Sequence, residues 1–460
     1  IGNESQERMG LLVHEKDLEK IQKVADREQA QMFVVGETTD DMRLVFKQGD
    51  DKKPIDLDLD DFFGKSPQTV MVDETVEETY EAPQYDVEDL EKYVKDVLRL
   101  DSVSSKDWLV NKVDRSVTGL VARQQTQGEI QLPLSDCGAV ALDYKGYRGL
   151  ASSIGHAPQV AMIDPAAGSV MAVSEALTNM VFAPLAEGLK SVSLSANWMW
   201  PCRNEGEDAR LYKAVEACSD FAINLGINIP TGKDSLSMTQ QYEDGKVISP
   251  GTVIISASGE VNNVRKIVSP TIAYIKGTYL YHVDFSLDLL KLGGSAFAQT
   301  MGKIGDEAPT VTDPEYFKSA FNAIQELVNR GLIIAGHDIS EGGMITTLLE
   351  MCFANPQGGI EARLDKIRHS DLIKILFSEN PGVVIQVKHH HLVEKILDDY
   401  GVGFAIVGRP IEERKLIVSK DGFRQSFDID ELRDTWSYTS YLFDQKQSGS
   451  EHAAARFGII

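Results

Sequence analysis

Two short segments of the chain carry the oxygen ligands that a hard divalent cation prefers. Ser135-Asp136-Cys137 directly follow the strand-like run 131–134, and an open α/β sheet presents ligands at the ends of its strands. Glu175 and Asn179 stand four residues apart in a helical pattern, so both side chains should share one helix face. A carboxylate and an amide oxygen on that face suit Mg²⁺. A turn aspartate and an exposed Glu–Asn pair are the ordinary alternatives.

A third segment, residues 331–343, combines a strand pattern with polar residues and glycines. The apolar run 331–335 leads into His337-Asp338-Ile339-Ser340-Glu341, and Gly342-Gly343 precede an expected helix over 344–352. Glycines allow a ligand to approach the backbone closely, and a helix N-terminus favours a phosphate group. A capped helix start would use the same residues, so the motif by itself leaves both interpretations open.

These segments would form a magnesium–nucleotide site if they meet. Asp136, Glu175, Asn179 and Asp338 supply three carboxylates and an amide, and a triphosphate adds further negative charge. Two unit charges about 4 Å apart repel by about 4 kcal/mol at an effective dielectric constant of roughly 20. Several such pairs cannot coexist without a cation, so we expect Mg²⁺, and more than one ion, between the carboxylates and the phosphates.

Three other features are weaker signals. Gly232-Lys233-Asp234-Ser235 resembles the end of a P-loop, but position 227, where that pattern needs a glycine, is Ile. Lys233 stays open as an anion contact or a surface lysine, and the histidines at 389–391 fit a solvated helix start. No Cys-x-x-Cys pair occurs among the four cysteines, Cys137, Cys202, Cys218 and Cys352. We interpret them as buried thiols of a reducing compartment, which indicates a cytoplasmic protein.

The composition limits the classes of protein to which the chain can belong. Its 460 residues suffice for two or three domains, and 42% hydrophobic with 25% charged residues is typical of a globular protein. No apolar run reaches about 18 residues, and the polar start of the chain is no signal peptide. The net charge of −24 argues against a nucleic-acid or membrane-surface partner.

An internal repeat organises the elements that must position these residues. The copies cover 7–59 and 381–430, and each has the order strand, helix, strand, with Gly36 or Gly408 after the second strand. Each continues into another β-like run and a stretch rich in Asp and aliphatic residues. Such a repeat signals a duplicated domain. Because the second copy ends a domain that begins near residue 278, we expect the chain to start inside a domain and to be a fragment of a longer polypeptide.

The remaining patterns predict a mixed architecture. Residues 64–85 have the composition of a linker, and the polar tail after residue 432 suggests a second one. Apolar runs typical of strands occur at 132–142, 159–163, 247–257, 278–283 and 331–335. Helical patterns occur at 87–100, 170–183, 208–225, 316–330 and 344–352.

Longer motifs carry a resemblance to a known family. With the three site segments, the sequence resembles the synthetase portion of the phosphoribosylformylglycinamidine synthases of the large, single-chain type. The resemblance extends over nearly the whole chain. Its further motifs are Asn3-Glu4-Ser5-Gln6-Glu7-Arg8, Asp114-Arg115-Ser116-Val117-Thr118-Gly119, Ser195-Ala196-Asn197-Trp198-Met199, Gly206-Glu207-Asp208-Ala209 and Gly232-Lys233-Asp234-Ser235-Leu236-Ser237-Met238.

The resemblance implies an α/β (α+β) fold made of aminoimidazole-ribonucleotide-synthetase-like units, each with an N-terminal and a C-terminal lobe. Two such units follow one another in the family, in agreement with the repeat. The implied domains are residues 1–60, the end of the first unit's C-terminal lobe; 61–100, a linker and helix; 101–265, the second N-terminal, nucleotide-binding lobe; 270–435, the second C-terminal lobe; and 436–460, a tail leading toward a missing glutaminase domain.

The resemblance also implies roles for individual residues. The family's magnesium ligands fall on Asp136, Glu175, Asn179 and Asp338, and its nucleotide contacts fall on Lys106, Ser135 and Ser340, where Ser135 departs mildly from the family's usual Ala. In the family this second-unit site holds a tightly bound nucleotide that is regarded as structural, whereas turnover occurs in the first unit. No catalytic residue is assigned in this chain, and contacts of Lys233 and Asn197 with substrate stay open.

The activity implied by the resemblance is a glutamine-dependent ligation in purine biosynthesis. ATP phosphorylates the formamide oxygen of formylglycinamide ribonucleotide, and ammonia then displaces the phosphate, giving formylglycinamidine ribonucleotide. The cofactors are Mg²⁺ and ATP or ADP, and the ammonia comes from a glutaminase domain with a nucleophilic Cys. None of the four cysteines here stands in a Gly-x-Cys-x-Gly context. The implied partners are therefore the first synthetase unit and the glutaminase domain of the full-length chain, together with a small-molecule nucleotide.

Two other functions stay open. The chain could be a complete ATP-using enzyme of the same superfamily, against which the incomplete repeat at residues 1–60 argues. It could also be a scaffold whose degenerate site binds nothing and only supports partner domains. Retained nucleotide and metal would separate a ligase fragment from a scaffold.

Overall fold

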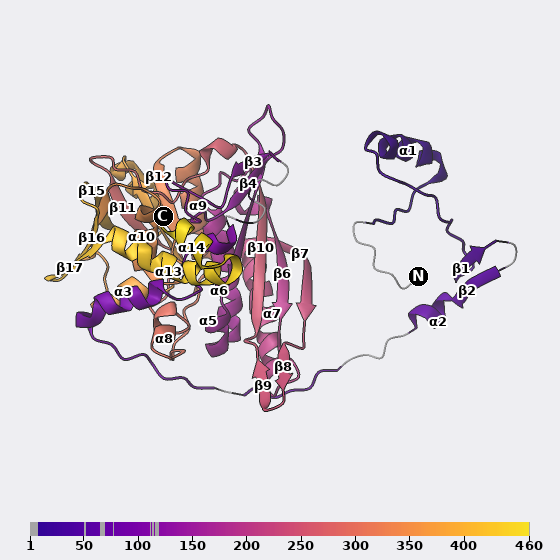
Figure 1. Cartoon of the computed structure of the whole chain (residues 1–460), viewed down its shortest axis with the longest axis horizontal. Coiled ribbons are helices and arrows are strands. Elements are labelled where there is room, and N and C mark those ends of the chain that lie inside the picture. The colour runs from indigo at the N-terminus through magenta and orange to yellow at the C-terminus, as the bar shows by residue number, and fades with distance from the viewer. Residues whose placement is uncertain are drawn as a thin grey trace. The chain divides into compact units, whose positions relative to one another are not determined.

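The structure is a computed structural model that describes residues 8–49, 52–64, 70–76, 78–110, 112, 115 and 119–459. It divides into two compact units, Ile1–Met71 and Val72–Ile460 (Figure 1). Of the motifs at 3–8 and 114–119, residues 3–7, 114 and 116–118 lie outside the described residues. Within the part that is described, no helix combines the length and apolar character needed to cross a membrane.

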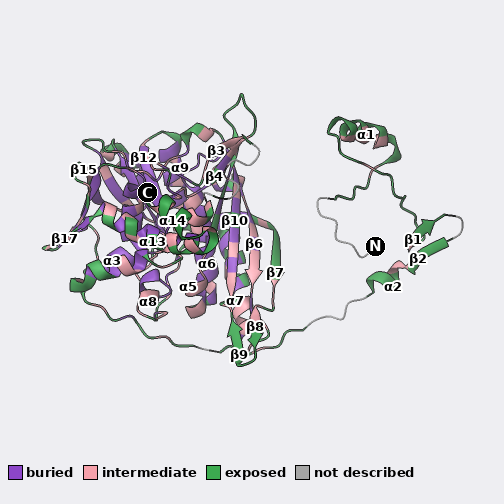
Figure 2. Cartoon of the chain, viewed as in Figure 1, coloured by how far each residue is buried: buried purple, intermediate pink, exposed green. Residues whose placement is uncertain are grey.

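The described residues of the first unit form a helix, a two-stranded hairpin and a short helix that follows the hairpin. A 3-10 turn at Glu15–Asp17 leads into α1, Leu18–Arg27. Strands β1 (Arg43–Gln48) and β2 (Lys52–Asp58) pair antiparallel, and α2 (Leu59–Phe63) begins where the Asp58 side chain accepts from the N–H of Asp60 at 3.0 Å. None of the described residues of this unit is buried (Figure 2).

The internal repeat is visible in the order of elements, but two expected strands of the first copy do not form. In the second copy, strands and helices follow as β14 (Gly382–Val387), α12 (His390–Asp399), β15 (Phe404–Ile411), β16 (Lys415–Lys420), β17 (Phe423–Asp428) and α13 (Ile429–Ser448). The first copy matches α12 with α1, β16 and β17 with β1 and β2, and the start of α13 with α2.

The segments 9–13 and 32–36, which correspond to β14 and β15, are not strands. In the second copy, β14 pairs with β11 (Tyr279–Asp284) and β12 (Ile333–Asp338), and β15 pairs with β11 and β13 (Gly359–Arg363). The described residues of the first unit include no strand that could play those parts. Because a strand needs a neighbour to satisfy its backbone groups, the strand prediction for these two segments is wrong in this chain.

The N-terminal lobe of the second unit is built on a six-stranded sheet of order β3-β4-β5-β10-β6-β7, antiparallel except for the β6–β7 pair. Burial alternates along β5, so one sheet face packs on helices and the other is open (Figure 2). The strands are β3 (Val121–Arg123), β4 (Gly138–Ala141), β5 (Gly149–His156), β6 (Val192–Met199), β7 (Asn228–Ser235) and β10 (Thr252–Val261), with a hairpin of β8 (Thr239–Tyr242) and β9 (Gly245–Ile248); the helices are α5 (Pro158–Ile163), α6 (Pro165–Met180) and α7 (Glu207–Leu225).

The C-terminal lobe is built on a seven-stranded sheet of order β12-β14-β11-β15-β13-β16-β17, in which only β13 and β16 pair in parallel. Helices cover both faces: α9 and α12 contribute to one buried cluster, and α3, α10, α11 and α13 to the other. The further elements are β11 (Tyr279–Asp284), β12 (Ile333–Asp338), β13 (Gly359–Arg363), α3 (Leu90–Leu98), α4 (Asp107–Val110), α8 (Ala296–Thr300), α9 (Pro314–Asn329), α10 (Gly343–Phe353), α11 (Leu372–Phe377) and α14 (Ser450–Phe457).

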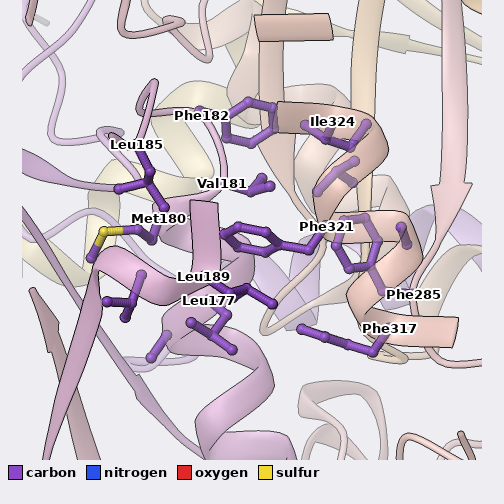
Figure 3. Close-up of a cluster of buried hydrophobic side chains, with 14 of the residues drawn as sticks. Leu177, Met180, Val181, Phe182, Leu185, Leu189, Phe285, Phe317, Phe321 and Ile324 are labelled. Atoms are coloured by element: carbon purple, nitrogen blue, oxygen red, sulfur yellow. The ribbon is translucent and has the colours of Figure 1, made fainter. Parts of the chain in front are cut away.

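One buried cluster joins the two lobes. Figure 3 shows side chains from α6 and the segment after it packed against α9 and against Phe285, which follows β11. Phe182 and Phe321 are both fully buried there. Gln325 adds a satisfied polar contact across the boundary, since its side chain donates to the carbonyls of Val181 and Ala183 at 2.7 and 2.8 Å. The lobes are therefore halves of one packed body.

Two further strand predictions are wrong. Residues 131–134 form no strand beyond a single bridge from Leu132 to Gln127, and β4 begins only at Gly138, after Asp136. The apolar run 159–163 is helical, because Pro158 stands in the first turn of α5, where it suits a helix. The apolar residues that suggested a strand are those that α5 buries, such as Val160 and Ala161.

The polar tail is folded rather than a linker. It forms α13 and α14, in which Trp436 is buried and donates from Nε1 to the carbonyl of Val103 at 2.8 Å. Asp444 is buried as well and pairs with Lys112 and Arg456. Trp436, Ser440 and Asp444 follow one another at intervals of four, so a single helix face buries them despite the polar composition.

Candidate functional site

Asp136 and Asp338, predicted from separate segments, meet at one point of the structure. Asp338 ends β12, and Asp136 lies in the loop before β4. His337 Nδ1 is 2.5 Å from Asp136 Oδ1 and 3.5 Å from Asp338 Oδ1, while its Nε2 is 3.1 Å from Glu350 Oε2 on α10. One ligand atom from each of Asp136, His337 and Asp338 lies within 4.8 Å of the others, so the group has the spacing of a metal site.

The electrostatics of this group show an excess of negative charge. Burial, and then the charge of Asp136, raise the pKa of Asp338 to about 7, against the opposite effect of His337. Burial alone would lower the pKa of His337, but Asp136 and Glu350 raise it well above its ordinary value. Asp338 Oδ2 is buried without a hydrogen-bond partner. Buried oxygens are normally paired, so this atom fits a cation ligand.

A cleft beside this group contains the other predicted residues Glu175 and Ser340. It holds about 450 Å³ of space not filled by atoms, part of it open to solvent. Its walls come from α5 and α6 on one side and from the segments after β12 and before β14 on the other. The lining residues are His156, Ala157, Gln159, Val160, Met171, Glu175, Thr178, Gly294, Ile339, Ser340, Glu341, Glu379 and Pro381.

Glu175 and Asn179 share one face of α6, as their spacing predicts. Glu175 Oε2 accepts from the N–H of His156 at 2.7 Å, and Asn179 Nδ2 donates to the carbonyl of Ile154 at 3.2 Å, so both reach the end of β5. Helix α6 starts where the Asp164 side chain accepts from the N–H groups of Ala166 and Ala167. Glu175 lines the cleft, whereas Asn179, one turn further on, does not.

Three carboxylates face this cleft with few compensating charges. Burial, and then the charge of Glu341, raise the pKa of Glu175 well above its ordinary value. Burial raises the pKa of Glu341 to about 7 and that of Glu379 to about 8, although Lys106 opposes the first shift and two backbone N–H groups oppose the second. A cation in the cleft would relieve this repulsion.

Lys106 and Ser135, two of the three predicted nucleotide contacts, form hydrogen bonds to residues close to them in the sequence. Lys106 Nζ donates to the carbonyls of Asp101, Ser102 and Ser104 at 2.6, 3.1 and 2.6 Å. Burial lowers its pKa, and the charges of Glu341 and Glu350 oppose that shift, which places Lys106 near the acidic residues.

Ser135 Oγ donates to the carbonyl of Cys137 at 3.0 Å and accepts from Gln127 Nε2 at 3.1 Å. Neither Lys106 nor Ser135 lines the cleft, whereas Ser340 does. The structure thus brings the predicted residues into two adjoining groups, Asp136 with Asp338 and Glu175 with Ser340.

Several residues of the site were not assigned from the sequence. Glu350 and Glu379 contact His337 and Gly342, respectively, and His156 holds Glu175 through its backbone. Glu350 stands on the helix that follows the His-Asp motif, which is a signal that could have been used. Glu379 precedes β14 and has no local pattern that distinguishes it from a surface glutamate.

We expect the metal-free and nucleotide-free protein to lose stability between pH 6.5 and 8.5. The pKa values of Glu341 and Asp338 are about 7 and that of Glu379 about 8 in the folded chain, above the ordinary values of 4.5, 3.8 and 4.5. The folded state therefore binds more protons than the unfolded state, and the free energy of unfolding falls as pH rises through this window, by about 1–3 kcal/mol. Urea unfolding in EDTA at several pH values measures this.

Glu379→Gln should flatten part of that slope, because the amide has no proton to lose. A free energy of unfolding that rises from pH 6.5 to 8.5, or a slope that Glu379→Gln leaves unchanged, would contradict the prediction. The window lies above the range in which His156 and His282 titrate, since burial lowers the pKa of both.

Comparison with known proteins identifies the family to which the two lobes are similar. The family model described as FGAR-AT PurM_N-like domain matches residues 105–260, and the one described as AIR synthase related protein, C-terminal domain, matches residues 276–421. Both matches fall on the lobes of the second unit and confirm the predicted fold class, a mixed helix and sheet fold of aminoimidazole-ribonucleotide-synthetase type.

Solved structures of T. maritima PurL share this fold. The one complexed with FGAR superposes with a TM-score of 0.57 at 17% identity, covering 76% of this chain and 54% of that chain. The one complexed with ADP gives a TM-score of 0.54 at 17% identity, covering 75% and 51%. At this identity the likeness concerns the fold.

A relative of much higher identity is the probable phosphoribosylformylglycinamidine synthase, chloroplastic/mitochondrial, of Arabidopsis thaliana. It is 37% identical over 469 residues, which cover 97% of this chain and 33% of that protein. This chain thus spans about a third of the relative's length. Together with the two family models, this similarity shows that the chain belongs to the phosphoribosylformylglycinamidine synthase family.

Proposed function

We propose that the chain is part of a phosphoribosylformylglycinamidine synthase and that it holds a magnesium–nucleotide site. The whole enzyme would use ATP and glutamine to convert formylglycinamide ribonucleotide into formylglycinamidine ribonucleotide. The observation that carries the proposal is the buried, unpaired Oδ2 of Asp338. Burial raises the pKa of Asp338 and that of Glu175, which lines the adjoining cleft formed by both lobes.

The residues present fit Mg²⁺. Asp136 and Asp338 would bind the Mg²⁺ ions from the loop before β4 and the C-terminal end of β12, and Glu175 and Asn179 would bind them from α6. These carboxylate and amide oxygens would supply only some of the metal ligands, so phosphate oxygens could supply others. Bound magnesium neutralises the phosphates and the carboxylates together. Ser340 would contact the nucleotide from the cleft wall, and Lys106 and Ser135 from the adjoining loops.

The glutaminase step would belong to another part of the full-length protein. Burial raises the pKa of all four thiols here, to about 12 for Cys137, Cys202 and Cys352 and to about 11 for Cys218. A nucleophilic cysteine needs a lowered pKa, because the thiolate is the reactive form. The ammonia would therefore come from a partner domain of the same chain, as the resemblance implies.

We further propose that residues 1–60 end a C-terminal lobe of a first synthetase unit, that 61–100 connect it, and that 101–265, 270–435 and 436–460 are the second N-terminal lobe, second C-terminal lobe and tail. The exposed apolar segments 9–13 and 32–36 support this, since Val35 is 96% and Phe33 74% exposed. Strands of the first synthetase unit that correspond to β11, β12 and β13 would pair with these two segments.

Hydrogen exchange tests that arrangement. Amides of residues 9–13 and 32–36 should exchange rapidly in this chain and become protected when a longer chain supplies the preceding residues of the family's first unit. Equal rates in both proteins would refute the arrangement.

A cytoplasmic location is part of the proposal, and four unpaired cysteines support it. The Arabidopsis relative carries the description chloroplastic/mitochondrial. Imaging of a tagged full-length protein separates these compartments.

Native mass spectrometry tests the nucleotide site directly. Purified protein should retain one nucleotide with about two to three Mg²⁺ ions, in line with a triphosphate held among several carboxylates. Stripped protein should regain that mass when Mg-ADP is added. Protein that carries nothing and gains nothing would be a scaffold. Turnover of ATP by this chain alone would instead indicate a complete ATP-using enzyme of the superfamily.

A further inference from the structure

Glu379 connects two loops that border the cleft. It lies between α11 and β14, and its Oε1 accepts from the N–H of Gly342 at 2.7 Å and from the N–H of Ala296 at 2.9 Å. Gly342 follows Ser340 and Glu341, and Ala296 follows shortly after Gly294; these three preceding residues line the cleft. One carboxylate oxygen thus ties together two separate segments of the cleft wall.

Both loops pack closely against neighbouring backbone, so a small displacement of either loop would change the shape of the cleft wall. Gly342 and Gly343 have φ values of 92° and 70°, which favour glycine. A Cβ on Gly343 would lie 2.7 Å from the carbonyl oxygen of Leu376, on the helix that leads to Glu379. A Cβ on Gly294 would lie 2.7 Å from the backbone nitrogen of Val160, on the opposite lobe.

The two hydrogen bonds, rather than the charge, are what the loops receive from Glu379. Both go to the same oxygen, and both donors are backbone N–H groups. An amide oxygen at this position could accept both bonds equally well. A side chain without an acceptor would leave the two backbone N–H groups unpaired, and a buried N–H group without a partner destabilises the structure.

We propose that Glu379 is a positioning residue that holds the Ser340–Gly343 loop in the shape that binds the nucleotide. This inference rests on the proposed magnesium–nucleotide site. Glu379 acts through the backbone of Gly342, which fixes the end of the loop carrying Ser340, while Asp338 anchors the beginning of that loop in β12.

Substitutions at Glu379 separate hydrogen bonding from charge. With nucleotide-stripped protein at pH 7, calorimetric titration with Mg-ADP should give a Kd for Glu379→Gln within threefold of the wild type, because the amide oxygen accepts both bonds. Glu379→Ala should raise Kd at least tenfold. If the Ala variant does not fold, Glu379→Met fills the space without accepting a bond.

Asn380→Ala is the matched control. Asn380 is buried and donates to the carbonyl of Leu289 at 3.0 Å, but it does not line the cleft. Its loss should destabilise the chain and leave Kd within threefold. Hydrogen exchange of peptides 339–345 and 293–299 should quicken in Glu379→Ala and stay unchanged in Glu379→Gln.

Two outcomes overturn the inference. If Glu379→Gln binds as weakly as Glu379→Ala, the charge is what matters; if Glu379→Ala binds like the wild type, the loop needs no such tie. A wild-type protein that binds no Mg-ADP refutes the proposed function itself, and the hydrogen-exchange comparison then still shows whether Glu379 holds the loops.

Discussion

Asp338→Ala should abolish the stabilisation that Mg-ADP gives to the protein. A ligand present at about 100 times its Kd adds about 2.7 kcal/mol to the free energy of unfolding, which moves the wild-type Tm by several degrees. Without Asp338 the metal group loses its buried, unpaired oxygen and its contact with His337. Thermal unfolding of nucleotide-stripped protein with and without Mg-ADP measures the difference.

The same substitution should cost the ligand-free protein little. Asp338 lies close enough to Asp136 for that charge to raise its pKa, so its removal relieves repulsion between buried carboxylates. We expect a ligand-free Tm equal to or above that of the wild type. Asp399→Ala, at an exposed position at the end of α12, should keep the full ligand shift. Equal ligand shifts in wild type and Asp338→Ala would refute the assignment of the site.

Phe321→Ala should destabilise the second unit by about 3–5 kcal/mol, the usual cost of removing a buried aromatic ring. Phe321 is fully buried in the cluster that joins α9 to α6 (Figure 3). Because both lobes contribute to this cluster, we expect them to unfold together in one transition at a lower temperature. Calorimetry and urea unfolding followed by circular dichroism measure both effects.

Phe63→Ala provides the matched control for that loss. Phe63 belongs to the first unit and is 72% exposed, so its removal should change the unfolding of the second unit by less than about 0.5 kcal/mol. Two separate transitions in Phe321→Ala, or equal effects of the two substitutions, would contradict a shared core.

The helices were the most predictable part of the fold. Apolar residues recur at helical spacing in α9, and Asp313 with Pro314 marks its start, two residues before the predicted one. Short apolar runs were ambiguous, because 159–163 satisfies a strand pattern and a helix equally. The segments 9–13 and 32–36 show a different limit. Their composition suits strands, but a strand forms only where a neighbour exists.

The site could be predicted only in part. Asp136 and Asp338 were identified from their positions beside apolar runs, but the contact between their loops spans 201 residues from Asp136 to His337 and depends on how the lobes pack. Glu350 and Glu379 gain their contacts with His337, Gly342 and Ala296 from packing within the C-terminal lobe. The His-Asp motif points to the helix that carries Glu350, whereas no local pattern points to Glu379. The nucleotide contacts at Lys106 and Ser135 came from family resemblance, and they stay predictions, since both side chains bond to their own loops.

The packing of Phe182 against the helix that carries Phe321 has a kinetic consequence. A hinge that opened the cleft would have to separate these fully buried rings, and exposing that much apolar surface costs several kcal/mol. A molecule seated between the lobes would therefore escape by local movement of the surrounding loops, while the lobes stay closed. The rate at which those loops open would set its residence time. That residence time would therefore be longer than the time a molecule needs to diffuse out of an open groove.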